Sequence, residues 1–350
     1  MRGSFRAVPI ALAAAALACS TGVERTVPPT PSASAAAASS AAPGVAASAS
    51  ASVSAAAPPV AAPRFTSEEA LALLYPEGKT LAELGCTAGD EDEIARCLIR
   101  SRYGDDAAGL TTALAFYDEF GSIPGVEGEH DMEGGFRGTI HIVPERPIGK
   151  YQTHFDWILA AQRDIRDVFA AIDARKTHDV RYRYKPIGWK FMRSVGRTTP
   201  SAYANDWRVG YNVSGSLNKS MNAVRDTMVH EIFHDNDGEA NDWSRATLGA
   251  LYDGIVAKCG TKIACLTPYT PMKTTVRGGT YYAFQPDNGD GVHEYAAELA
   301  SRYYLETRAA IRGESFPDGR FKCGPEENAK SWSAIVDMFF GGVDLVPACK

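Results

Sequence analysis

The segment His230-Glu231-Ile232-Phe233-His234 combines residue types and a spacing that could hold a metal ion and move a proton. On a helix, residues four apart are offset by only about 40° and about 6 Å, so both imidazoles can bind one zinc ion. Glu231 lies about 100° further round the helix, near the metal but not on it. The metal would activate a water molecule and polarise a carbonyl group. The pattern therefore predicts His230 and His234 as zinc ligands and Glu231 as the general base.

The residues around this motif favour a buried helix. Uncharged residues precede it at Thr227-Met228-Val229 and lie within it at Ile232-Phe233, whereas an exposed helix would alternate charged residues. An incidental histidine pair on a helix surface is the alternative interpretation. Asp235 departs from the usual peptidase pattern, in which an uncharged residue commonly follows the second histidine.

A catalytic zinc needs a third protein ligand and one open position. A metzincin would have a glycine three residues after His234 and a His or Asp three residues further on, but Asp237 and Ala240 stand there. An aspzincin would have a G-T-x-D segment, but Gly279-Thr280 is followed by two tyrosines. The third ligand is therefore expected to be a glutamate on a later helix.

Glu294 and Glu298 are four residues apart, on one face of a helix predicted over residues 290–312. We expect Glu294 to bind the zinc and Glu298 to hydrogen-bond a ligating imidazole, which would fix its tautomer. Another interpretation is a solvated helix face with Glu298 paired to Arg302. The other candidate third ligands are Glu298 itself, Glu239 and Asp242.

These residues together resemble the gluzincins, zinc peptidases that combine H-E-x-x-H with a glutamate in an E-x-x-A-[DE] motif on a second helix. The matching residues are His230, Glu231, His234 and Glu294-Tyr295-Ala296-Ala297-Glu298. The second motif is most similar to that of the lethal-factor-type toxin peptidases, and the resemblance covers roughly residues 139–306. It implies a zincin fold with one Zn²⁺ and a small sheet whose edge strand lies over the cleft.

The resemblance also implies an edge strand and a tyrosine at the cleft. Residues 208–213, just before the histidine helix, are the expected edge strand, to which a peptide substrate would add as another strand. A tyrosine before the glutamate helix would donate a hydrogen bond to the developing oxyanion. Tyr282 is expected in this role in preference to Tyr281. A buried core tyrosine is the alternative.

The remaining patterns predict an α+β fold. Further strands are expected at residues 139–143 and 181–195, and residues 121–138 are expected to be a loop. Helices are expected at residues 66–75, 90–102, 105–120, 151–174, 219–234, 240–258, 290–312 and 327–340. Residues 139–350 would form the zincin-like metallopeptidase domain, and residues 65–138 an added N-terminal helical region.

The first 64 residues have a different composition from the rest. Arg2 and Arg6 precede an apolar run over residues 8–17, the pattern of a secretory signal peptide over residues 1–18. Residues 26–63 carry no charge, and 31 of these 38 residues are Ala, Ser or Pro. Such a segment cannot bury a core, so residues 19–64 are expected to form a disordered linker. The chain has 36 basic and 42 acidic residues without a basic cluster, which disfavours nucleic-acid binding.

The cysteines indicate export. Ala16-Leu17-Ala18-Cys19 resembles a bacterial lipobox, although Ala16 stands where leucine is usual, and it also fits an ordinary signal-peptidase site. Lipidation of Cys19 leaves six cysteines, an even number that suits an oxidising compartment. Of the 15 possible connectivities, the shortest loops give the expected disulfides Cys86–Cys97, Cys259–Cys265 and Cys323–Cys349.

The sequence therefore predicts an exported zinc-dependent metalloendopeptidase, held to a membrane only through the lipid on Cys19, or else secreted. It would be a monomer that acts on a peptide or protein substrate. One alternative is a zinc lipoprotein that acts on a dedicated partner or a cell-wall peptide. The other is a catalytically silent binding lipoprotein, which would have no need of Glu231.

Overall fold

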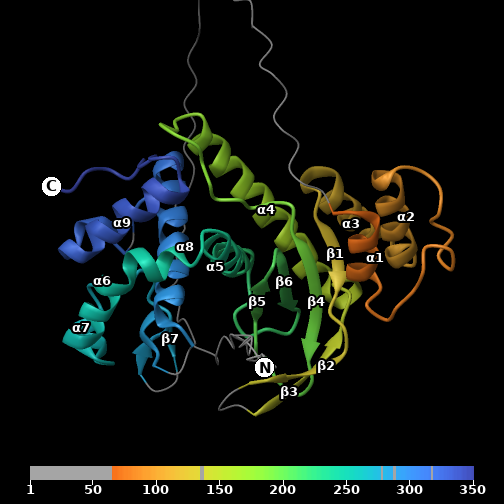
Figure 1. The fold of residues 1–350 in the computed structure, drawn as a ribbon, viewed down its shortest axis with the longest axis horizontal. Helices are drawn as coiled ribbons and strands as arrows, with labels where there is room; N and C mark the ends of the chain where they lie inside the picture. Colours follow the sequence, from red (N-terminus) through yellow and green to blue (C-terminus); the bar gives the residue numbers. More distant parts are fainter. Residues whose placement is uncertain (1–64, 135–137, 277–278, 287–288, 317) are drawn as a thin grey trace, which may run out of the picture.

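The computed structural model describes residues 65–134, 138–276, 279–286, 289–316 and 318–350. The expected signal peptide, Cys19 and the linker lie outside these residues. Within them the chain has a mixed α+β fold, as predicted (Figure 1). No helix of this described part is long and apolar enough to cross a membrane.

A curled six-stranded sheet forms one half of the fold. Its strands are β1 (Ile123–Val126), β2 (His130–Glu133), β3 (Thr139–Pro144), β4 (Gly188–Ser194), β5 (Ala202–Asn205) and β6 (Arg208–Asn212). β4 pairs in parallel with β1 and β6 and antiparallel with β3, so it organises the sheet. A separate hairpin pairs β7 (Thr275–Val276) with β8 (Thr280–Tyr281).

The strand at the edge next to β6 is β5, and the expectation that residues 208–213 form the edge is wrong. β6 pairs with β4 on one side and antiparallel with β5 on the other, so both of its edges are occupied. β5 pairs with β6 alone within the described sheet. With only four residues, β5 is too short for its sequence pattern to predict a strand.

Long helices pack against this sheet and against one another. Within the described residues, the α-helices are α1 (Ser67–Leu74), α2 (Glu91–Tyr103), α3 (Ala107–Phe120), α4 (Gln152–Asp173), α5 (Met221–Glu239), α6 (Trp243–Cys259), α7 (Ile263–Leu266), α8 (Gly291–Arg312) and α9 (Glu326–Phe339). Eight of them correspond to predicted helices, with ends shifted by a few residues. The largest shift is in α5, which continues five residues beyond His234.

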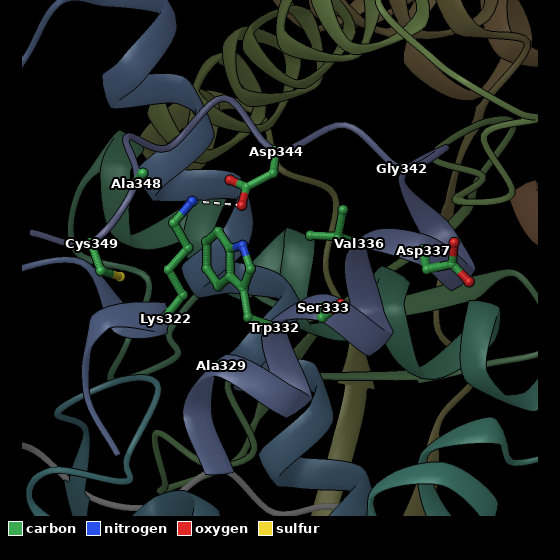
Figure 2. Close-up of a pocket in the computed structure, with 10 residues that line it drawn as sticks. All are labelled: Lys322, Ala329, Trp332, Ser333, Val336, Asp337, Gly342, Asp344, Ala348 and Cys349. Carbon is green, nitrogen blue, oxygen red and sulfur yellow. Dashed lines mark hydrogen bonds and ion pairs between the residues drawn. The ribbon is translucent and has the colours of Figure 1, made fainter. Parts of the chain in front are cut away.

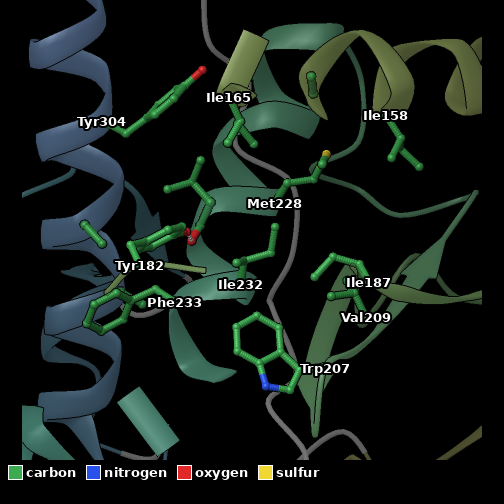
Figure 3. Close-up of a cluster of buried hydrophobic side chains, with 14 of the residues drawn as sticks. Ile158, Ile165, Tyr182, Ile187, Trp207, Val209, Met228, Ile232, Phe233 and Tyr304 are labelled. Atoms are coloured by element: carbon green, nitrogen blue, oxygen red, sulfur yellow. Dashed lines mark hydrogen bonds between the residues drawn. The ribbon is translucent and has the colours of Figure 1, made fainter. Parts of the chain in front are cut away.

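Helix α5 lies between the sheet side and α8 (Figure 1). The Ser220 side chain caps it by accepting a hydrogen bond from the Ala223 N–H. Met228, Ile232 and Phe233 are at most 1% exposed. Figure 3 shows these three side chains among others from α4, the sheet and α8. The close packing of these residues therefore fixes the rotation of α5 and the direction of its histidines.

The N-terminal region contributes strands as well as helices. Residues 123–126 and 130–133 form β1 and β2, so the expectation of a loop over residues 121–138 is wrong. β1 is buried along its whole length although it contains Pro124 and Gly125, two residues that weaken a strand prediction. Phe116 of α3 packs edge-on against Trp189 of β4. Residues 65–126 therefore share one hydrophobic core with the later described residues.

Disulfide bonds join Cys86 to Cys97, Cys259 to Cys265 and Cys323 to Cys349. These are the pairs expected from the shortest loops. The first closes the loop before α2, the second ties the end of α6 to α7, and the third fixes the C-terminal segment to the turn before α9. Each restricts the unfolded chain and thereby stabilises the fold.

The attachment of the N-terminal region can be tested at Gly125. A Cβ atom there would lie 2.3 Å from the Leu73 carbonyl oxygen of α1 and 2.8 Å from the Trp189 carbonyl oxygen of β4. We expect Gly125→Ala to lower the free energy of unfolding in urea by about 2 kcal/mol or more, because backbone atoms must separate. Gly128→Ala is the control, since its Cβ would approach nothing closer than 3.7 Å. Equal stability of the two variants would contradict the close packing of α1, β1 and β4.

Candidate metal centre

The side chains of His230, His234 and Glu294 converge between α5 and α8. His230 Nε2 lies 3.1 Å from Glu294 Oε2, and His234 Nε2 lies 3.8 Å from Glu294 Oε1. The two imidazole Nε2 atoms are 3.2 Å apart. One donor atom from each residue lies within 4.8 Å of the others. The i, i+4 pair on α5 and the glutamate on α8 therefore face one common point.

The chemistry of these donors fits a bound metal ion such as zinc. Two imidazole nitrogens and a carboxylate oxygen are ligands that zinc accepts. Glu294 is 1% exposed, and its Oε1 has no hydrogen-bond partner. A buried carboxylate oxygen without a partner is costly, and a cation at this point would satisfy it. His230, His234 and Glu294 are accordingly the residues that could hold the ion.

The charges of the three donors are coupled. Burial alone would lower the pKa of His230, but the hydrogen bond and charge of Glu294 outweigh it and raise the pKa to about 9. Burial lowers the pKa of His234 to about 4, against the opposing charge of Glu294. Burial would raise the pKa of Glu294, yet the two histidines hold it below its usual value. Without a metal, the cluster is therefore one imidazolium, one neutral imidazole and one carboxylate at neutral pH.

Glu231 is buried beside the donors without being one of them. Its side chain is 2% exposed, and burial raises its pKa to about 7, with His230 opposing and Glu294 adding to the rise. A carboxyl group with a pKa near neutrality can both accept and return a proton at physiological pH. This position and pKa are those that a general base needs.

Glu298 is also buried, but its contacts differ from the expected ones. Its hydrogen bonds come from the Met272 N–H and the Thr274 side chain, in the segment leading into β7, and not from an imidazole. Burial raises its pKa to about 8. Arg302 pairs with Glu306 and not with Glu298, so the solvated-face alternative does not hold. Glu298 thus ties α8 to the β7–β8 hairpin.

The two candidate tyrosines lie in different surroundings. The Tyr282 ring is 5.9 Å from the His230 ring, and its hydroxyl group hydrogen-bonds Glu294. The Tyr281 hydroxyl lies 3.0 Å from Thr267 Oγ1. Tyr282 is 5% exposed, in a small apolar cluster with Val276 and Leu217. Of the two tyrosines, Tyr282 therefore has its hydroxyl group beside the metal donors.

The end of α5 explains why acidic residues follow His234. Asp235 accepts a hydrogen bond from the Trp207 N–H, and Asp237 Oδ1 accepts one from the Ser244 N–H at 2.8 Å. Glu239 Oε1 accepts the indole N–H of Trp207 at 2.5 Å. Glu239 is therefore engaged elsewhere, and neither it nor Asp242 belongs to the metal-donor group. Without knowledge of where Trp207 lies, sequence patterns could not reveal these contacts.

A described hollow lies elsewhere on the molecule. It has a volume of about 510 Å³ and is lined by α9 and the C-terminal segment, with Trp332 and the Lys322–Asp344 ion pair at its wall (Figure 2). None of its lining residues is a metal donor or Glu231. It is not part of the candidate metal centre.

No protein-family model, curated protein or solved structure matches this chain.

Metal analysis tests the donor set directly. We expect the purified protein to hold one zinc ion per chain, and His230→Ala and Glu294→Ala each to weaken zinc binding at least about tenfold because a ligand is lost. His293→Ala is a matched control: it neighbours Glu294 in sequence, but its Nε2 is turned towards Asp237, 3.8 Å away. Loss of zinc in the control, or retention in both ligand variants, would refute this donor set.

The pKa of His230 predicts a pH dependence. A proton with a pKa of about 9 must leave before the imidazole can bind a metal. Zinc affinity should therefore rise between pH 6.5 and pH 8.5, and binding at pH 7.5 should release about one proton or more. Titration calorimetry in two buffers of different ionisation enthalpy measures this number. Release of no proton would show that His230 is neutral in the metal-free protein.

Proposed function

We propose that this protein is an exported zinc-dependent endopeptidase of the gluzincin type, with a zincin-like fold. The observation that carries the proposal is the convergence of His230 and His234 from one helix with Glu294 from another, with Glu231 buried beside them. The three disulfides support export, because such bonds persist in oxidising compartments. Cys19 would carry the lipid and residues 19–64 would form the tether.

The proposed reaction is hydrolysis of a peptide bond. A zinc ion held by the three donors would supply Lewis-acid polarisation of the carbonyl group and activation of water. Glu231 would accept the proton of the attacking water and return it to the leaving amine. The Tyr282 hydroxyl would donate to the developing oxyanion. The substrate would be a peptide that lies extended along β5, whose outer edge pairs with no other strand of the described sheet.

A variant of the base tests the chemistry separately from metal binding. Glu231→Gln keeps the shape of the side chain but cannot accept a proton. We expect it to retain zinc and to lower the rate of cleavage of unfolded casein by about 100-fold or more. Glu326→Gln, at an exposed glutamate of α9, is the control and should retain full activity. Casein cleavage by Glu231→Gln at the wild-type rate would exclude this mechanism.

If the zinc-loaded wild type leaves casein intact, the general endopeptidase is excluded. A zinc enzyme restricted to a dedicated partner or a cell-wall peptide would then be the hypothesis to pursue.

A further inference from the structure

The turn between β5 and β6 holds a tryptophan in a backbone conformation that this residue rarely adopts. Asn205 pairs with Arg208, so Asp206 and Trp207 form a two-residue hairpin turn. Their φ angles are 54° and 58°. Such turns prefer Asn, Asp or Gly at the first position and Gly at the second, so Asp206 suits its place and Trp207 does not. A bulky tryptophan in this place needs contacts elsewhere that hold it.

Those contacts come from helix α5. The Trp207 N–H donates to Asp235, and the indole N–H donates to Glu239 Oε1 at 2.5 Å. The Arg183 guanidinium lies 3.8 Å from the centre of the Trp207 ring and donates to Glu239 Oε1 at 3.2 Å. Trp207 is 8% exposed and belongs to the main core, where Figure 3 shows it below Ile232. The backbone N–H, the indole N–H and the ring face of Trp207 therefore each have a partner.

The position of Asp235 makes these contacts relevant to the metal centre. Asp235 directly follows His234, so one turn of one helix carries a metal donor and the anchor of the hairpin. Asp235 is 8% exposed, and its Oδ2 has no hydrogen-bond partner. A buried carboxylate in this state costs stability. An apolar residue here would avoid that cost but would leave the Trp207 N–H without its acceptor.

We propose that Asp235 and Trp207 are positioning residues that set the height and register of edge strand β5 relative to His230 and His234. This inference depends on the proposed function. An extended peptide that pairs with β5 can bring a carbonyl group to the metal donors only if the distance from β5 to α5 is fixed. The anchor fixes it through a rigid helix. The substrate class it serves is an unfolded or extended segment of at least about four residues, the length of β5.

Variants of the anchor separate this role from general stability. Asp235→Ala removes the acceptor for the Trp207 N–H, whereas Asp235→Asn keeps one. Trp207→Phe keeps an aromatic ring, a smaller one, but removes the indole donor to Glu239. Asp206→Gly is the control, because it relieves the turn and leaves Trp207 in place. The full chain of each variant is measured for zinc content, for amide hydrogen exchange over residues 202–212, and for kcat and KM on unfolded casein.

We expect Asp235→Ala to speed exchange of the β5–β6 amides by about tenfold or more while exchange in α8 stays unchanged. KM for casein should rise about fivefold, with kcat within about twofold and zinc retained, because strand addition is impaired and the chemistry is not. Trp207→Phe should show a smaller effect of the same kind. Asp235→Asn and Asp206→Gly should stay close to the wild type.

Unchanged exchange over residues 202–212 in Asp235→Ala would overturn the proposal. So would a rise of exchange throughout the chain, or a fall in kcat at constant KM. If the zinc-loaded wild type does not cleave casein, the peptidase proposal fails separately, and the exchange data alone decide whether Asp235 anchors the edge strand.

Discussion

The structure depends on the burial of Glu294. Its carboxylate is 1% exposed, and transfer of such a charge out of water costs several kcal/mol. The compensation comes from the two imidazoles of α5 and from the Tyr282 hydroxyl. It is effective only if α5 and α8 stay within one side-chain length of each other. The packing of α5 against both α4 and α8 therefore supports the metal centre as well as the core.

Each helix that carries a donor also holds a neighbouring hairpin. Helix α5 holds the β5–β6 turn through Asp235 and Glu239, and α8 holds the segment before β7 through Glu298. The Tyr282 N–H in turn donates to the Thr274 carbonyl at 2.8 Å, which places its hydroxyl beside Glu294. The metal donors and the strands beside them are thus fixed to the same two helices, α5 and α8. Such support is what a preorganised site requires.

The sequence predicted what depends on local spacing and missed what depends on long-range pairing. The direction of His230 and His234 follows from the helical period, and Glu294 from a motif on a second amphipathic helix. β1 and β5 have four residues each, and β1 contains a proline and a glycine, so their pairing with β4 and β6 carries no local signal. The predicted hydrogen bond of Glu298 to an imidazole was wrong for the same reason. The observed partners of Glu298 lie in residues 272–274, and no helical pattern predicts the position of that segment.

A partly buried carboxylate of the same chain shows the usual surroundings of an acid with a structural role. Asp164 of α4 accepts hydrogen bonds from the Tyr304 hydroxyl at 2.9 Å and the Arg308 guanidinium at 2.8 Å, with Arg312 paired to its other oxygen. Glu294 and Glu298 are more deeply buried, yet each keeps one oxygen without a hydrogen-bond partner, and the charge of His230 acts on both. Arginine side chains neutralise Asp164, whereas a histidine takes that place beside Glu294 and Glu298. Acids left incompletely satisfied at one point are expected where a cation and a substrate, rather than the fold, complete the site.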